Sequence, residues 1–114
     1  MAETFKVITK AGVTTLDDIY TVASSTTTVI IGLVIGNTTT SQITSTVTLS
    51  SNTSNRAGAN NEANQDVELV TNVPIPAGSS LSVLDGKMIM EATDILKVSA
   101  TGACDVIISI LEQT

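Results

Sequence analysis

The sequence predicts an all-β domain. Apolar and polar residues alternate along much of the chain, which is the period of a half-buried strand. Clusters of Pro, Gly, Asn, Asp, Ser and Thr separate these stretches and mark turns. The apolar residues are mainly aliphatic, and the abundant β-branched residues fit a pleated surface. Eight or nine short strands at this spacing are typical of a sandwich or a barrel.

The N-terminal half is expected to hold four strands, at residues 5–9, 16–23, 28–37 and 43–49. The segment Lys10-Ala11-Gly12 is expected to end the first of them. The third is the most apolar segment, and its continuous apolar run predicts a central strand that is covered on both faces. A short buried helix is the competing interpretation there, which Gly32 and the adjacent isoleucines disfavour.

The C-terminal half is expected to hold strands at residues 66–72, 80–83, 87–91, 95–98 and 105–112. Val67 and Leu69 are expected to face inward on the first of these. Asp85-Gly86 predicts a tight hairpin turn between the strand around Leu81 and the strand around Met88. Both faces of the last strand are apolar, so we expect it to be central or to face a neighbouring subunit.

A polar, Asn-rich segment at about residues 50–65 (SSNTSNRAGANNEANQ) interrupts the strands. Because it has no large apolar residue, it cannot bury enough surface to offset the entropy of ordering it. We expect a long exposed loop, which is either a tolerated insertion or a contact loop. The possible partner-contact residues in it are Asn52, Asn55, Arg56, Asn60, Asn61 and Asn64.

The length and charge of the chain limit its class. Its 114 residues predict one domain, a single β-sandwich over 1–114. Five basic residues against eleven acidic ones give a formal charge of −6, and the basic residues are scattered. We therefore expect no nucleic-acid partner and no anionic membrane partner. A single cysteine excludes a disulfide within the chain, so stability must come from packing or from association with other subunits.

The residues that usually carry catalysis are scarce. The chain has no histidine, and Cys104 therefore lacks the partner that activates a cysteine nucleophile. The adjacent Asp17 and Asp18 would point to opposite faces of a strand. Asp85, Glu91 and Asp94 lack the spacing of a calcium loop, and turn formation accounts for Asp85 and Asp94. We predict no catalytic residues, no metal site, no cofactor and no enzymatic activity.

Several segments together resemble small virion proteins of tailed bacteriophages of the marine and cyanophage type. They are MAETFKVI at the start, TTLDDIYTVASSTTTVIIGLVIGN over residues 14–37, PIPAGSSLSVLDGKMIMEATDILKV over residues 74–98, and DVIISILE near the end. Ala23 stands where this pattern often has proline. The resemblance implies a jelly-roll-like sandwich of about eight strands, which is usually homo-oligomeric and displayed on a virion.

The resemblance implies a capsid decoration (cement) protein that binds the outer head surface and stabilises the shell. The implied partners are other copies of the chain, with a trimer favoured, and the major capsid protein or another virion protein. The implied location is the virion, assembled in the cytoplasm of the host bacterium. The alternative is a neck-, tail- or fibre-associated virion protein that binds a host receptor or glycan through the Asn-rich loop.

Overall fold

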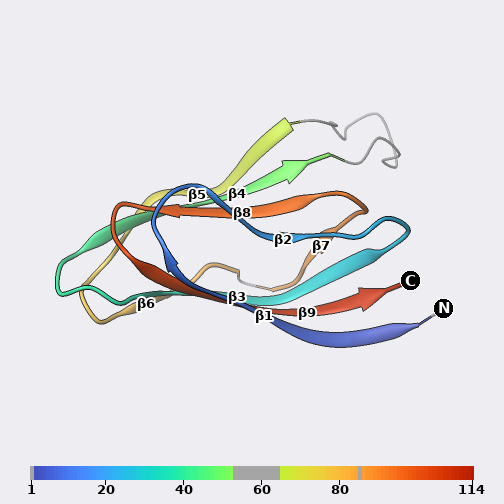
Figure 1. The fold of residues 1–114 in the computed structure, drawn as a ribbon, viewed down its shortest axis with the longest axis horizontal. Helices are drawn as coiled ribbons and strands as arrows, with labels where there is room; N and C mark the ends of the chain where they lie inside the picture. Colours follow the sequence, from blue (N-terminus) through green and yellow to red (C-terminus); the bar gives the residue numbers. More distant parts are fainter. Residues whose placement is uncertain (1, 53–64, 85) are drawn as a thin grey trace.

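The computed structural model describes residues 2–52, 65–84 and 86–114, and these residues form nine β-strands and no helix (Figure 1). The strands are β1 (Glu3–Val13), β2 (Asp17–Thr21), β3 (Thr27–Asn37), β4 (Ile43–Ser51), β5 (Gln65–Ile75), β6 (Ser80–Ser82), β7 (Met88–Met90), β8 (Ile95–Ala100) and β9 (Cys104–Gln113). The predicted all-β class is confirmed. Within the described ranges, no helix is long and apolar enough to cross a membrane.

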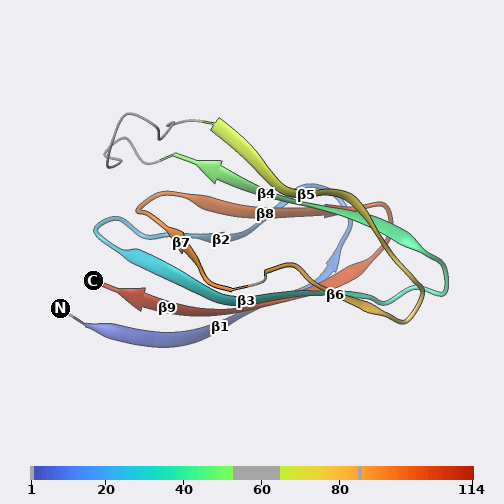
Figure 2. The ribbon, with the colours of Figure 1, turned by 180° about the vertical axis from the view of Figure 1, so that it is seen from behind.

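The strands form two antiparallel sheets that face each other as the two layers of a sandwich (Figures 1 and 2). The first sheet has the order β1-β9-β3, with β6 and β7 both on the far edge of β3, and the second has the order β2-β8-β4-β5. The pairs β1 with β9, β2 with β8, β3 with β6 and β7, and β4 with β5 make a jelly roll. The jelly-roll-like sandwich is therefore confirmed, with one of its usual eight strands split into β6 and β7.

The split strand corrects one prediction. The strands around Leu81 and Met88 do not pair with each other as a hairpin, because both pair with β3. Leu81 lies opposite Ile35, and Met88 lies opposite Ile30, so the chain continues along the same edge of β3. Gly86 has a φ of 123°, which lets the chain bend between the two pieces. Asp85 itself lies outside the described residues.

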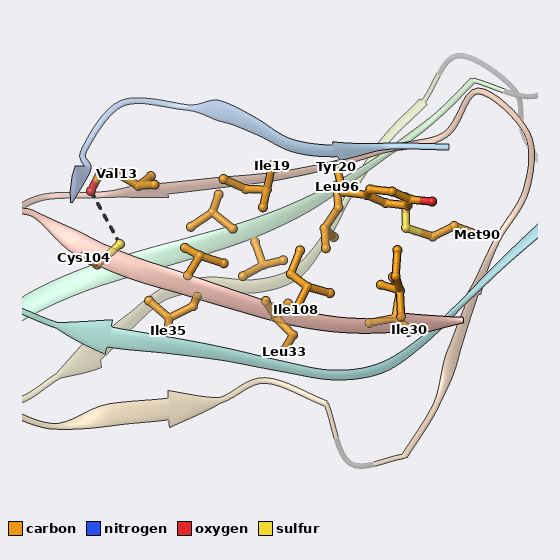
Figure 3. Close-up of a cluster of buried hydrophobic side chains, with 14 of the residues drawn as sticks. Val13, Ile19, Tyr20, Ile30, Leu33, Ile35, Met90, Leu96, Cys104 and Ile108 are labelled. Carbon is orange, nitrogen blue, oxygen red and sulfur yellow. Dashed lines mark hydrogen bonds between the residues drawn. The ribbon is translucent and has the colours of Figure 1, made fainter. Parts of the chain in front are cut away.

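The core lies between the two sheets and is made by the inward residues of the alternating strands (Figure 3). Its largest fully buried side chains are Ile30, Leu33, Ile35, Ile75, Met90, Leu96, Ile108 and Ile110. Residues from β3 and β9 in one sheet meet residues from β8 in the other (Figure 3). β9 lies between β1 and β3, so its predicted central place is confirmed, and Val106, Ile108 and Ile110 are all buried.

Two strand predictions are wrong in detail, and a third strand departs from simple alternation. The first strand does not end at Lys10-Ala11-Gly12 but continues to Val13, because Gly12 adopts a φ of 69° within an irregular stretch of the pairing. On β2, a register shift between Asp18 and Tyr20 turns both Ile19 and Tyr20 inward. On β5, Val67 faces solvent rather than the core.

The Asn-rich segment begins later and ends earlier than predicted. Ser50 and Ser51 belong to β4, and Gln65 belongs to β5. Residues 53–64 lie outside the described residues. The two chain ends lie side by side, joined by hydrogen bonds of 3.2 and 2.9 Å between the backbones of Ala2 and Thr114 (Figure 1).

Candidate interaction surface

Exposed apolar side chains gather on the outer face of the first sheet. Six of the eight large apolar residues that are exposed in the described chain lie on its strands: Phe5, Val7, Ile31, Val34, Ile89 and Ile107. Phe5 is 75% exposed, and Val7 and Ile89 are each 64% exposed. We call the outward residues of β1, β9, β3 and β7 the outer face. The prediction that residues 28–37 are covered on both faces is wrong, because Ile31 and Val34 are exposed.

The strand registers arrange the outer face in rows that run across the sheet. The first row is Phe5, Leu111, Val29 and Ile89, one residue from each of four strands. The second row is Val7, Ser109 and Gly32, and the third is Thr9, Ile107, Val34 and Ser82. Directly opposite residues lie about 4.5–5.5 Å apart in such pairs. The rows therefore form one continuous surface, although Phe5 and Leu111 stand far apart in the sequence.

No charged residue occurs in these three rows. Glu3 and Asp105 lie beyond them, at opposite ends of the first sheet. The three rows are therefore uncharged, in a chain whose formal charge is −6. Contiguous exposed apolar area of this kind marks an interaction site in soluble proteins.

The outer face of the second sheet has the opposite character. Thr46 lies beside Ser99 in the pairing of β4 with β8, and Lys97 lies on the same face of β8 as Ser99. Thr48, opposite Lys97, is only 5% exposed. Lys97 in turn lies opposite Asp18 on β2, with 4.0 Å between the Lys97 Nζ and the Asp18 carboxylate. The hydroxyl-rich, charged surface suits contact with water, so the two sheets of the sandwich differ in what they present to solvent.

The buried Asp94 carboxylate holds Asn52, where the Asn-rich segment follows β4. Asp94, only 1% exposed, accepts a 2.9 Å hydrogen bond from the backbone N–H of Asn52. The Asn52 amide donates to the carbonyl of Thr93 at 3.2 Å, and its Oδ1 accepts from Ser50 at 3.3 Å. Asn52 thus holds the end of β4 against the turn before β8. The other predicted contact residues, Asn55, Arg56, Asn60, Asn61 and Asn64, lie outside the described residues, and a role in partner contact stays a prediction.

A polar cluster joins the two sheets at the end where the termini lie. The Tyr20 hydroxyl donates a 2.5 Å hydrogen bond to Glu112 Oε2 and lies 2.7 Å from Thr28 Oγ1. Glu112 Oε1 lies 2.6 Å from Lys6 Nζ. Burial and the bond to Glu112 raise the pKa of Tyr20 to about 12. The hydrogen bonds from Lys6 and Tyr20 lower the pKa of Glu112. The contacts among Tyr20, Thr28, Glu112 and Lys6 connect the two sheets, and we call these four residues the clamp.

Cys104 lies in the core rather than at a surface. Its side chain is 0% exposed, and its Sγ lies 3.5 Å from the carbonyl oxygen of Val13 (Figure 3). Burial raises the pKa of this thiol, which disfavours the reactive thiolate. Among the residues that the structure describes, no group of three or more Cys, Asp or Glu comes together to hold a metal ion.

Comparison with known proteins gives one informative likeness. No protein-family model matches the chain, and no curated protein sequence matches it. A solved structure that matches is described in the words "Bacillus endospore appendages form a novel family of disulfide-linked pili". The two share 16% sequence identity at a TM-score of 0.52, over 97% of this chain and 84% of the other. At this identity the likeness establishes a shared fold.

The assignment to phage virion proteins is wrong, because the matching structure is an appendage pilin and not a virion protein. The predictions that depended on this assignment are therefore also wrong. They are the capsid decoration role, the homotrimer on the head, the major capsid protein as partner and the virion location. The physical reason is that the segments at 14–37 and 74–98 are the strand and turn pattern of a jelly roll. Unrelated proteins with this fold share such a pattern.

Proposed function

We propose that this chain is a non-enzymatic structural subunit that associates with copies of itself into a fibre or appendage. The observation that carries the proposal is the outer face, whose three central rows are uncharged and expose Phe5, Val7 and Ile89 on one side of a small sandwich. Such a surface is stabilised when a partner covers it. The proposal keeps the fibre association from the sequence-based alternative, without the virion.

The likeness to an appendage pilin supports this proposal, because it is a protein of the same fold that forms pili. That appendage is described as disulfide-linked. In this chain Cys104 is buried in the core and is the one cysteine of the sequence. Association through the folded domain described here therefore does not use a disulfide.

A fibre grows through one contact between two different patches, or through two contacts that each pair a patch with itself, since a contact that pairs the same patch on two copies closes on itself. The outer face supplies one contact. The strands β1, β2 and β5 stand at sheet edges, where backbone N–H and C=O groups are available for a second one. The sandwich thus has both an apolar face and hydrogen-bonding edges with which to associate.

The test is the state of association of the purified chain as its concentration is raised. Size-exclusion chromatography with light scattering should show particles larger than a monomer at micromolar concentration, and negative-stain electron microscopy should show elongated assemblies at higher concentration. A protein that stays monomeric up to several hundred micromolar, with no assemblies in the microscope, would overturn the proposal.

A further inference from the structure

β1 is a long free edge of the first sheet, with 11 residues. It pairs with β9 on one side, and no strand of the described chain pairs with its other side. Ala2 and Thr114 exchange two backbone hydrogen bonds, so they form a hydrogen-bonded pair of the antiparallel ladder. Every second residue of β1, counted from Ala2, bonds to β9 in the same way, and the backbone groups of the residues between them point away from β9. The residues with these free N–H and C=O groups are Glu3, Phe5, Val7 and Thr9.

The other three sheet edges carry features that hinder pairing with a further strand. β2 has five residues and a register shift, and the far edge of the first sheet is split into β6 and β7, of three residues each. β5 has two register shifts against β4, a φ of 50° at Asn72, and Pro74, which lacks an N–H. β1, in contrast, pairs regularly with β9 from Glu3 to Lys10. It is the one long and regular edge in the described part of the chain.

The charges on β1 leave its apolar side available to a further strand. Lysines on an edge strand discourage such pairing, and β1 carries Lys6 and Lys10. The Lys6 ammonium lies 2.6 Å from Glu112 Oε1, so an ion pair within the same copy holds this lysine. Both lysines lie on the inward side of β1, whereas Phe5 and Val7 are exposed on the outer face. A strand beside β1 would therefore add apolar contact on the outer face to its backbone hydrogen bonds.

We infer that β1 of one copy pairs with β1 of a second copy, edge to edge and antiparallel, around a twofold axis at Val7. Val7 then lies opposite Val7 of the second copy, and Phe5 lies opposite Thr9 of the second copy. The free N–H and C=O groups of these three residues make about six hydrogen bonds between the copies. The same edge serves both copies, as a twofold contact requires.

Charge and length select the axis at Val7. The free backbone groups of the two copies face one another only when the axis lies at a residue, so the choice is among the residues of β1. An axis at Lys6 would place Lys6 opposite itself, and an axis at Ile8 would place Lys6 opposite Lys10, with like charges together in both cases. An axis nearer either end of β1 would pair fewer residues. With the axis at Val7, no charged residue of β1 lies opposite another.

The pair joins the outer faces of two copies into one surface. A twofold axis at right angles to the first sheet keeps both outer faces on the same side of it. The second row then continues from Val7 of one copy to Val7 of the other, and the first row continues from Phe5 into the third row at Thr9. The inference rests on the proposed function and deepens it, because it names the edge and the symmetry of one self-contact.

Thr9→Pro tests the pairing, because proline removes the N–H that points to the free edge and leaves the bonds between β1 and β9 in place. The control Thr9→Ala changes the same side chain and keeps this N–H. Since a twofold pair loses the hydrogen bond twice, we expect Thr9→Pro to associate at least about tenfold more weakly than Thr9→Ala in sedimentation equilibrium.

A disulfide across the pair tests the register and does not depend on how Thr9→Pro folds. Hydrogen-bonded partners on antiparallel strands lie about 5.5 Å apart between their Cα atoms, which suits a disulfide. A mixture of Phe5→Cys and Thr9→Cys should therefore give mixed dimers, identified by their mass, on oxidation with copper–phenanthroline. Each variant alone should give far fewer dimers, as should the wild type, whose Cys104 is buried.

Two results would overturn the β1 pair. One is equal association of Thr9→Pro and Thr9→Ala, and the other is a mixture that gives no more mixed dimers than the separate variants give dimers. In either case, fibres seen in the microscope would still support the proposed function. A wild-type protein that is only monomeric would overturn both the pair and the proposed function.

Discussion

The Tyr20 hydroxyl donates a 2.5 Å hydrogen bond to the Glu112 carboxylate, and this bond joins the two sheets of the sandwich. Tyr20 comes from β2 in one sheet, and Glu112 comes from β9 in the other. Lys6, on the edge strand β1, holds the second oxygen of the same carboxylate. The ring of Tyr20 lies near Met90 in the core (Figure 3). The clamp therefore holds the first and last strands to the sandwich at the end where the chain begins and ends.

Tyr20 is the one tyrosine of the chain, so its titration can be read directly from the absorbance of the phenolate. We expect a midpoint near pH 12 in the folded protein and about 10 in urea, because burial disfavours the phenolate. Stability from this group is complete below pH 10 and is lost as the pH rises toward 12. Spectrophotometric titration with and without urea measures both midpoints. Equal midpoints in the two conditions would show that the clamp does not form.

Glu112→Gln should make the free energy of unfolding depend less on pH between pH 3 and pH 6. Because the folded pKa of Glu112 is lowered, its contribution is present above its ordinary pKa of 4.5 and is lost as the pH falls through the folded value. Urea unfolding between pH 3 and pH 6 should show wild type the more stable at pH 6, by about 1–2 kcal/mol for hydrogen bonds to a charged group. This difference in the free energy of unfolding between wild type and Glu112→Gln should become smaller as the pH falls. A gap that is the same at every pH would contradict this role.

Val7→Ser should weaken self-association, whereas Val67→Ser should not. Both valines are exposed, and both lie on edge strands, but only Val7 belongs to the outer face. Burial of a valine contributes about 1.5 kcal/mol, so association should fall by about tenfold for each Val7 that the contact covers. Sedimentation equilibrium measures both variants. Equal weakening by the two substitutions would show that the association does not use the outer face.

Cys104 should react slowly with thiol reagents in the folded protein. Its side chain is buried and its pKa is raised by burial, so reaction awaits opening of the sandwich. A colorimetric disulfide reagent should label the native protein many times more slowly than the urea-unfolded protein. A reducing agent should leave the assemblies intact. Dissolution of the assemblies by reductant would contradict non-covalent association.

Asn37→Ala should destabilise the fold far more than Asn52→Ala. The buried Asn37 amide donates to the carbonyls of Ser41 at 2.8 Å and Ile75 at 2.9 Å, and its Oδ1 accepts from the Thr39 N–H at 2.9 Å. Its loss leaves buried backbone groups without these partners, at a cost of about 2–3 kcal/mol. Asn52→Ala should cost less than about 1 kcal/mol, because the hydrogen bond from the Asn52 side-chain amide to the Thr93 carbonyl is exposed. Urea unfolding followed by circular dichroism compares the two, and equal costs would contradict this reading.

The alternation of apolar and polar residues by itself determined the fold class and most of the strands. The positions of the strands along the chain are set locally, because successive side chains on a strand point to opposite faces and turn residues end the strand. The inward series Val106, Ile108 and Ile110 follows directly from this rule. The scarcity of reactive residues is equally plain in the composition.

Only the tertiary structure decided where the leftover apolar residues gather. A register shift at Asp18 and Tyr20, and another at Ile30 and Gly32, breaks the simple alternation. The outer face exists because β9 inserts between β1 and β3, which brings Phe5 beside Leu111 and Leu111 beside Val29. Strand order and register depend on the packing of the whole chain. For that reason the sequence alone could say that apolar surface remained, while the structure shows that it lies on one sheet.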